Sequence, residues 1–121
     1  MRLALPSHLH DSAPYRNGRN GLWTVIAEAK GVAVGLAWSV DSLVGSRTVL
    51  LEEVAVVAEW QRQGVGTHLV RQTAAWMYEL GYVRLVSKPI TPGARAMFGR
   101  LGFSDDGQGM SVAPCADLVD Q

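Results

Sequence analysis

The stretch Gln61-Arg62-Gln63-Gly64-Val65-Gly66 decides the fold of this chain. It joins an apolar segment, residues 48–57, to an amphipathic segment, residues 65–80. Glycine has no Cβ, so the two glycines permit a tight turn from a strand into a helix and let a ligand approach the backbone. The first N–H groups of a helix lack partners within it and point outward with the positive end of the helix dipole. The stretch therefore predicts a phosphate-binding loop, and we expect a diphosphate as its ligand.

Two common phosphate loops do not match this stretch. A Walker loop has Lys and then Ser or Thr after its last glycine, whereas Thr67 and His68 follow Gly66. A dinucleotide-binding loop has a third glycine three residues further on, where Leu69 stands. A lone Q-x-x-G-x-G string also occurs in ordinary strand-to-helix turns, so both interpretations stay open at this level.

Together with its surroundings, the loop resembles that of the GNAT superfamily of acyl-CoA-dependent N-acyltransferases. The resemblance runs from about Leu22 to Val112 and rests on residues 51–56 (LEEVAV), the Q/R-x-x-G-x-G/A loop and residues 94–103 (ARAMFGRLGF). It implies the α+β GNAT fold, a mixed, mostly antiparallel central sheet with a splayed parallel strand pair and flanking helices. The chain departs from the family in Phe98 for a frequent Tyr, Thr91 for a frequent Asn, and a short N-terminal portion.

The resemblance implies a co-substrate site for acetyl-CoA in a wedge between two parallel strands, here residues 50–57 and 83–87. Main-chain N–H groups of residues 63–67 would hold the pyrophosphate, and an N–H near Val54 would bind the oxyanion of the thioester under attack. The full candidate set for binding the co-substrate is Val54, Ala55, Val56, Gln61, Arg62, Gln63, Gly64, Val65, Gly66 and Thr67.

Glu52 and Glu53 are the candidates for the general base. A primary amine with a pKa of ~10.4 is protonated at neutral pH, so attack on a thioester requires removal of a proton. Adjacent side chains of a regular strand point to opposite faces, so either the strand bulges or one carboxylate enters a cleft. We favour Glu52 over Glu53; the alternative is that both are solvated or ion-paired charges at a bulge.

Phe98 bears on whether the chain is active. In many relatives, as the resemblance implies, a Tyr at this position protonates the departing sulfur, which a phenyl ring cannot do. A thiol pKa of ~8.5 still makes the thiolate a tolerable leaving group. We also expect Phe98 to pack on Phe103, with Gly102 ending the helix in the left-handed conformation. Two functions follow: an N-acetyltransferase for an unidentified primary amine, or a catalytically silent acyl-CoA-binding or regulatory domain.

The composition limits the classes of partner that we expect for this chain. The chain has 121 residues, 48% of them hydrophobic, and eleven basic residues balance eleven acidic ones, which indicates one domain and no nucleic-acid or anionic-membrane footprint. The apolar run at the N-terminus is too short for a signal peptide, so we expect a cytoplasmic protein. Cys115, in a polar tail of residues 114–121, is the only cysteine, which excludes a Cys-based metal cluster. His8 and His10 lack a third ligand, so we expect no metal site.

The remaining elements follow from periodicity and capping residues. Residues 23–28 and 32–40 predict a hairpin, with Val32, Val34, Leu36, Trp38 and Val40 on one face and only small residues on the other, against which another element can pack closely. Further expectations are a helix over 65–80 ending at Gly81, a parallel strand over 83–87, a helix capped by Thr91, and a strand over 110–113. Residues 1–21 are expected to be mostly loop, and a homodimer is expected to complete the acceptor site.

Overall fold

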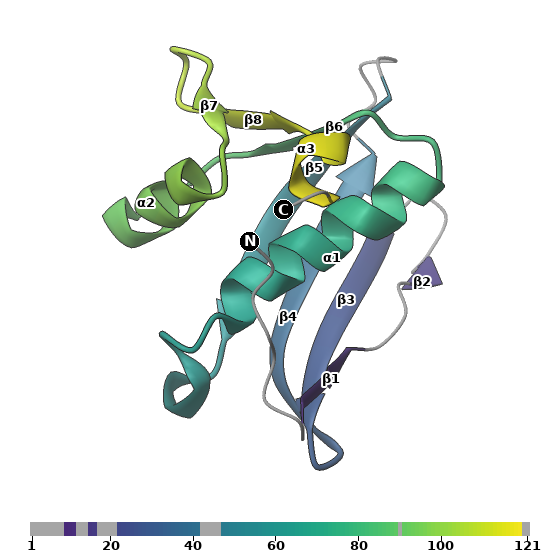
Figure 1. The fold of residues 1–121 in the computed structure, drawn as a ribbon, viewed down its shortest axis with the longest axis vertical. Helices are drawn as coiled ribbons and strands as arrows, with labels where there is room; N and C mark the ends of the chain where they lie inside the picture. Colours follow the sequence, from purple (N-terminus) through teal and green to yellow (C-terminus); the bar gives the residue numbers. More distant parts are fainter. Residues whose placement is uncertain (1–8, 12–14, 17–21, 42–46, 90, 120–121) are drawn as a thin grey trace.

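A single mixed sheet organises the chain. The structure, a computed structural model, describes residues 9–11, 15–16, 22–41, 47–89 and 91–119 (Figure 1). Within them the strands are β1 (Leu9–Asp11), β2 (Tyr15–Arg16), β3 (Leu22–Ala29), β4 (Val32–Asp41), β5 (Thr48–Val56), β6 (Arg84–Ser87), β7 (Ser104–Asp105) and β8 (Ser111–Pro114). The helices are η1 (Ala58–Trp60, a 3-10 turn), α1 (Val65–Glu79), α2 (Pro92–Arg100) and α3 (Cys115–Val119).

The strand order is β1-β3-β4-β5-β6-β8-β7, with β2 also paired to β3. Every pair is antiparallel except β5 and β6, which run parallel from Thr48 opposite Arg84 to Leu51 opposite Ser87. Beyond Leu51, β5 continues to Val56 without β6 beside it, so the two strands splay apart. The predicted fold class, with its splayed parallel pair, is confirmed.

The hairpin of β3 and β4 presents small residues to α1. Val25 pairs with Ala37 and Ala27 with Gly35, and these positions are buried on the face that α1 covers. The predicted close packing is thus confirmed. The expectation of one continuous apolar face fails at two positions. Val32 is 64% exposed. The neighbours Val34 and Gly35 are both buried, because a register shift between Ala27 and Glu28 interrupts the alternation of the two faces.

Gly35 is the tightest point of this contact, and its replacement provides a test of it. An added Cβ would lie 3.1 Å from Leu69 Cδ1 and 3.2 Å from the main-chain oxygen of Ala55. We expect Gly35→Val to lower the free energy of unfolding by ~1–3 kcal/mol through overpacking, although Val favours strands. Gly99→Val, in a helix with open space around the added group, is the control. Equal denaturant midpoints for the two variants would contradict the close contact.

Both long helices end as the sequence predicts. At the end of α1, Gly81 has φ +100°, and the N–H of Tyr82 donates to the carbonyl of Met77 at 3.0 Å. Thr91 Oγ1 caps α2 by accepting the N–H of Ala94 at 3.1 Å, with Pro92 in the first turn. At the other end of α2, the N–H of Phe103 donates to the carbonyl of Phe98 at 3.0 Å, after Gly102 at φ +98°.

Some short elements differ from the sequence-based expectation. Within residues 1–21, the described segments β1 and β2 are strands that pair with β3; they are too short to show an alternating pattern. The tail from residue 114 onward is not merely polar, because Cys115 and Leu118 are buried in α3, which packs on α1. The last strand is shifted by one residue, and β7 was not predicted.

Burial also changes the chemistry of Cys115. It raises the pKa of this thiol from 9.0 to about 11. The unfolded chain therefore loses its thiol proton at a lower pH than the folded chain does. The stability that depends on this group is complete below pH 9 and falls as the pH rises from about 9 to about 11.

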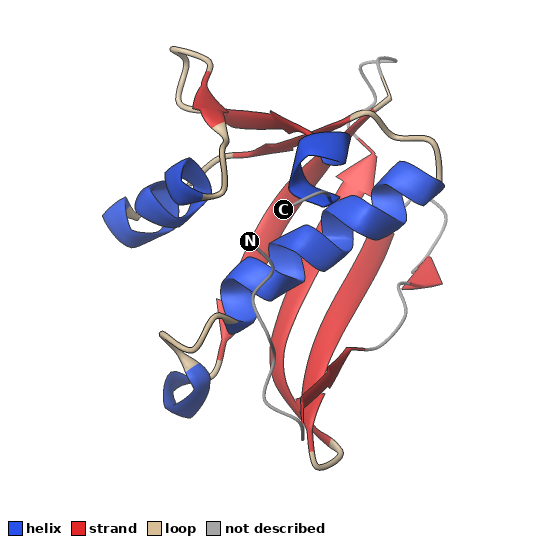
Figure 2. Cartoon of the chain, viewed as in Figure 1, coloured by secondary structure: helices blue, strands red, loops and turns tan. Residues whose placement is uncertain are grey.

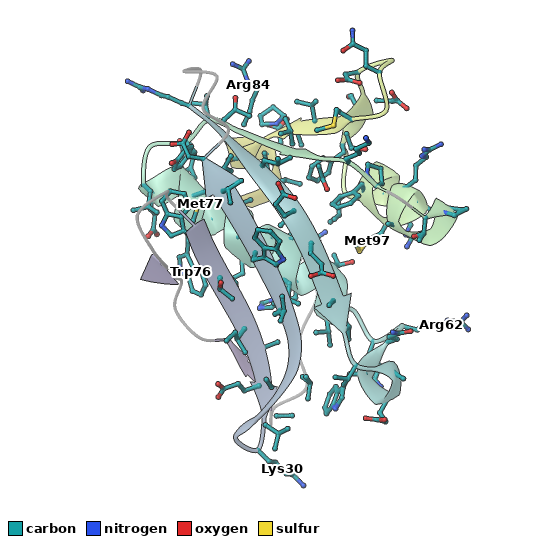
Figure 3. The ribbon with its side chains drawn as sticks, turned by 180° about the vertical axis from the view of Figure 1, so that it is seen from behind. Lys30, Arg62, Trp76, Met77, Arg84 and Met97 are labelled. Carbon is teal, nitrogen blue, oxygen red and sulfur yellow. The ribbon has the colours of Figure 1, made fainter. Side chains whose placement is uncertain are left out.

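The two faces of the sheet are covered differently. Helices α1 and α3 lie on one face, whereas in the view from behind no helix of the described residues covers β3, β4 and β5 (Figures 2 and 3). Cross-strand partners share a face, so the uncovered side carries Ile26, Leu36, Trp38, Glu53 and Ala55, and we call it the open face. Within the described residues, no helix combines the length and apolar character needed to cross a membrane.

Candidate acyl-CoA and acceptor site

A cavity of about 760 Å³ opens where β5 and β6 diverge, which is a common size for a small-molecule site. Ser87 Oγ donates to the carbonyl of Leu51 at 3.1 Å, at the last paired position of the two strands. The lining residues come from β5, the loop before α1, the end of β6 and α2: Glu52, Glu53, Val54, Val56, Trp60, Gln61, Arg62, Gly64, Gly66, Thr67, Ser87, Lys88, Pro89, Thr91, Gly93, Ala94, Met97, Phe98 and Arg100. A cavity is therefore present where the resemblance implies a wedge between the two strands.

One end of the cavity is the start of α1. Gly64 is the N-cap of this helix at φ +85°, no side chain caps it, and the first turn contains no acidic residue. The first N–H groups of a 15-residue helix are thus left for an anion. Two amide side chains brace the loop, because Gln61 Nε2 donates to the carbonyl of Val56 and Gln63 Nε2 to that of Glu59, both at 2.9 Å.

The middle of the cavity is a narrow apolar channel between β5 and α2. A Cβ on Gly66 would lie 3.5 Å from Met97 Sδ, and 3.8 Å from side-chain methyl carbons of both Val54 and Val56. Figure 3 shows Met97 on α2, on the side that faces β5. The missing side chain at Gly66 keeps the channel open for a slender ligand.

The main chain of β5 offers donors to this channel. The N–H of Val57 donates to the carbonyl of Val34 at 2.9 Å, so this position of the strand is turned toward β4. Along an antiparallel strand, the N–H and C=O groups of successive residues point alternately to its two sides, so those of Ala55 also point toward β4. The N–H and C=O groups of Val54 and Val56 point to the other side, where β5 and β6 splay apart. The carbonyl of Val56 already accepts from Gln61, which leaves the two N–H groups as the donors on this side.

The far end of the cavity is acidic. Trp38 pairs with Glu53 and Ser39 with Leu51, so Glu52 is the extra residue of a β-bulge, which is one of the two arrangements that the adjacent carboxylates allow. Both glutamates are exposed and line the cavity. Trp38 Nε1 donates to Glu53 Oε1 at 3.2 Å, whereas Glu52 has no hydrogen-bond or ion-pair partner among the described residues.

Phe98 both packs and lines the site. It is 4% exposed, and its ring meets that of Phe103 edge to face, with centroids 4.8 Å apart. The predicted packing on Phe103 is confirmed. Phe98 also borders the cavity, so this position combines a place in the core with contact to the wedge.

The candidate residues from the sequence are mostly brought together here. Ala55, Gln63 and Val65 are outside the cavity lining: Ala55 lies on the open face, the Gln63 amide braces the loop, and Val65 is buried against Gly35. A set that the sequence analysis missed completes the lining, with Trp60, Lys88, Met97 and Arg100 as its largest members. Their only sequence signal is position, Lys88 after a predicted strand and Met97 and Arg100 within a predicted helix.

Charge is distributed unevenly along the cavity. Arg62 belongs to the loop, Arg100 to α2, and Lys88 follows β6, while Glu52 and Glu53 stand at the bulge. The cationic side chains suit a polyanionic ligand such as a diphosphate, and the carboxylates suit an ammonium group. Among the described residues there is no group of three or more His, Cys, Asp or Glu side chains arranged to hold a metal ion.

The fold and the cavity define a class of protein with an open site between splayed parallel strands, at the start of a helix that no side chain caps. The family model described as "Acetyltransferase (GNAT) family" matches residues 3–103. The chain belongs to the GNAT acetyltransferase family. No sequence among curated proteins matches it significantly.

Solved structures agree with this assignment at the level of the fold. A GNAT-family protein from Desulfovibrio desulfuricans superposes with a TM-score of 0.73 and 19% identity, covering 78% of this chain and 70% of that one. The ribosomal-protein-S18-alanine N-acetyltransferase from Escherichia coli gives 0.67 and 19%, covering 83% and 72%. AtaTR bound with AcCoA gives 0.68 and 18%, covering 80% and 69%.

Proposed function

We propose that the chain is an N-acetyltransferase that moves the acetyl group of acetyl-CoA to a primary amine by direct attack. One observation carries the proposal: a single cavity joins the uncapped start of α1 to two carboxylates, past main-chain donors of β5. The first feature fits the diphosphate of coenzyme A, and the second fits a base for the amine. The solved structure of a relative with AcCoA supports this choice of co-substrate.

The residues of the channel have separate tasks. Main-chain N–H groups from Gln63 to Thr67 bind the diphosphate, and Arg62 adds positive charge. The narrow space over Gly66, between Val54, Val56 and Met97, takes the pantetheine arm, and the N–H of Val56 donates to it. The N–H of Val54 stabilises the negative charge that develops on the carbonyl oxygen during attack.

In this proposal, Glu52 at the bulge is the general base. The acceptor enters as an ammonium ion and loses a proton through water to Glu52, after which its nitrogen attacks the thioester carbon. The C–N bond forms, the nitrogen gives up a second proton to water, and the C–S bond breaks as the tetrahedral intermediate collapses. The sulfur leaves as a thiolate or takes a proton from water. Phe98 cannot supply that proton. The products are an N-acetyl amide and coenzyme A.

Turnover against a panel of amines tests the proposal. Release of free coenzyme A is measured with acetyl-CoA and with longer acyl-CoAs, with and without each amine. We expect release that depends on an amine and is fastest with acetyl-CoA. The alternative, a catalytically silent acyl-CoA-binding domain, predicts coenzyme A binding by calorimetry and no release with any amine.

Phe98→Tyr tests the departure of the sulfur. We expect turnover to rise ~2- to 5-fold, most strongly below the thiol pKa of ~8.5, because the ring is retained and a proton donor is added. Stability changes little if the hydroxyl faces the cavity, and falls by ~1–3 kcal/mol if it is buried without a partner. Steady-state rates and a denaturant midpoint separate the cases. A destabilised variant without a gain in rate would make position 98 purely structural.

We further propose a homodimer in which a second copy covers the open face and forms part of the acceptor site. Leu36, Trp38 and Ile26 give this face apolar side chains beside the glutamates of the cavity. The formal net charge is zero, so two copies do not repel one another. Light scattering is expected to give twice the chain mass at micromolar concentration. A strictly monomeric, active protein would contradict this proposal.

A further inference from the structure

The side chain of Trp38 ends on a carboxylate of the candidate reaction cavity. Trp38 and Glu53 are cross-strand partners on the open face, and the indole Nε1 lies 3.2 Å from Glu53 Oε1. An indole N–H is a donor only, and a hydrogen bond to a charged acceptor is stronger than one between neutral groups. The contact therefore fixes one oxygen of Glu53 and leaves the other available to a ligand, at a residue that lines the cavity.

The bulge makes the two glutamates unequal. Without the extra residue, neighbouring side chains would point to opposite faces of the sheet, yet both Glu52 and Glu53 line the cavity. Glu53 is held by Trp38, whereas Glu52 has no partner among the described residues. A carboxylate that binds a cation gains from a fixed position, while a base that exchanges protons through water needs access to solvent. The geometry thus suits Glu53 for binding and Glu52 for proton transfer.

We propose that Trp38 is a positioning residue, whose indole N–H holds the Glu53 carboxylate where Glu53 binds the ammonium group of the acceptor while Glu52 takes the proton. The inference rests on the proposed acetyl transfer and adds to it a division of labour between the two carboxylates. It also sets the class of acceptor, an amine that binds at the bulge as a cation.

Trp38→Phe tests the positioning directly, because a six-membered aromatic ring remains and only the five-membered ring with its N–H donor is lost. We expect the KM for the amine to rise about 3- to 10-fold, in keeping with the loss of one hydrogen bond, while kcat and the KM for acetyl-CoA change less than about 2-fold. Trp76→Phe, the same substitution on α1 at the other face of the sheet, is the matched control and leaves all three values in place.

A double-mutant cycle separates this role from packing. Glu53→Ala is expected to raise the amine KM, and Trp38→Phe added to Glu53→Ala is expected to raise it no further. Additive effects of the two substitutions, or a Trp38→Phe variant with an unchanged amine KM, would overturn the positioning role. If Trp38→Phe fails to fold, Glu53→Ala decides alone: a lower kcat at unchanged amine KM overturns the assignment of Glu53 to binding.

The proposed function and this inference fail in distinguishable ways. Wild-type protein that binds coenzyme A but turns over no amine overturns the acetyl transfer, and the inference with it. Wild-type protein that turns over an amine, with additive effects in the cycle, overturns the inference alone.

Discussion

Replacing Glu52 by Gln is expected to lower turnover by ~10² to 10⁴-fold, because the amine then keeps its proton and has no lone pair for attack. The affinity for acetyl-CoA should stay nearly the same, since Glu52 lies at the bulge, away from the loop that begins α1. Steady-state rates across the pH range and calorimetry with coenzyme A measure the two effects. Gln retains the size and polarity of Glu, so the exposed position is expected to tolerate it without a loss of fold.

The matched control for this prediction is Glu59→Gln. Glu59 is an exposed glutamate in η1, outside the lining of the main cavity, and its contact to Gln63 uses only its main-chain oxygen. We expect its turnover to equal that of the wild type. If Glu52→Gln and Glu53→Gln both retain full turnover, neither carboxylate is the base. If only Glu53→Gln loses turnover, the two roles are reversed.

Gly64→Val is expected to weaken coenzyme A binding by ~10- to 100-fold. Gly64 has φ +85°, a conformation that a β-branched residue avoids at a cost of a few kcal/mol, and it stands at the N-cap where the ligand must approach the backbone. The loop can relieve the strain only by moving the N–H groups that we propose bind the diphosphate. Calorimetry with coenzyme A measures the loss.

Gly107→Val separates this effect from a general loss of stability. Gly107 has a similar φ of +81°, nothing lies within 4 Å of its added Cβ, and it belongs to the turn between β7 and β8, outside the cavity lining. Both variants should lose a similar amount of stability, but only Gly64→Val should lose affinity. A folded Gly64→Val variant with unchanged affinity would remove the loop from the binding site.

Local signals made most of the fold predictable. The helix α1 follows from its periodic apolar residues and its two terminal glycines, and α2 follows from Thr91, Pro92 and Gly102. The elements that sequence could not predict are short. β1, β2 and β7 have three residues or fewer, and α3 shows only Cys115 and Leu118 as apolar contacts with the core. Their conformations depend on neighbours elsewhere in the chain, such as the edge of β3 to which β1 and β2 pair.

The same distinction between local and distant signals applies to the site. The proposed diphosphate loop and the two glutamates could be identified from the sequence because each is a contiguous stretch with its own chemistry. Lys88, Met97 and Arg100 reach the cavity only because β5 and β6 splay and α2 packs beside the opening, which no local pattern encodes. The contact of Trp38 with Glu53 depends on strand register, and the bulge at Glu52 shifts that register by one residue.

The most direct test of the proposed acetyl transfer is mass spectrometry of an amine after incubation with the protein and acetyl-CoA. We predict an N-acetylated amine in the same molar amount as the released coenzyme A, with no acetyl group left on the protein, because attack is direct. Tight coenzyme A binding with no acetylated product from any amine would contradict catalysis. An acetylated protein that then passes its acetyl group to the amine would contradict direct attack.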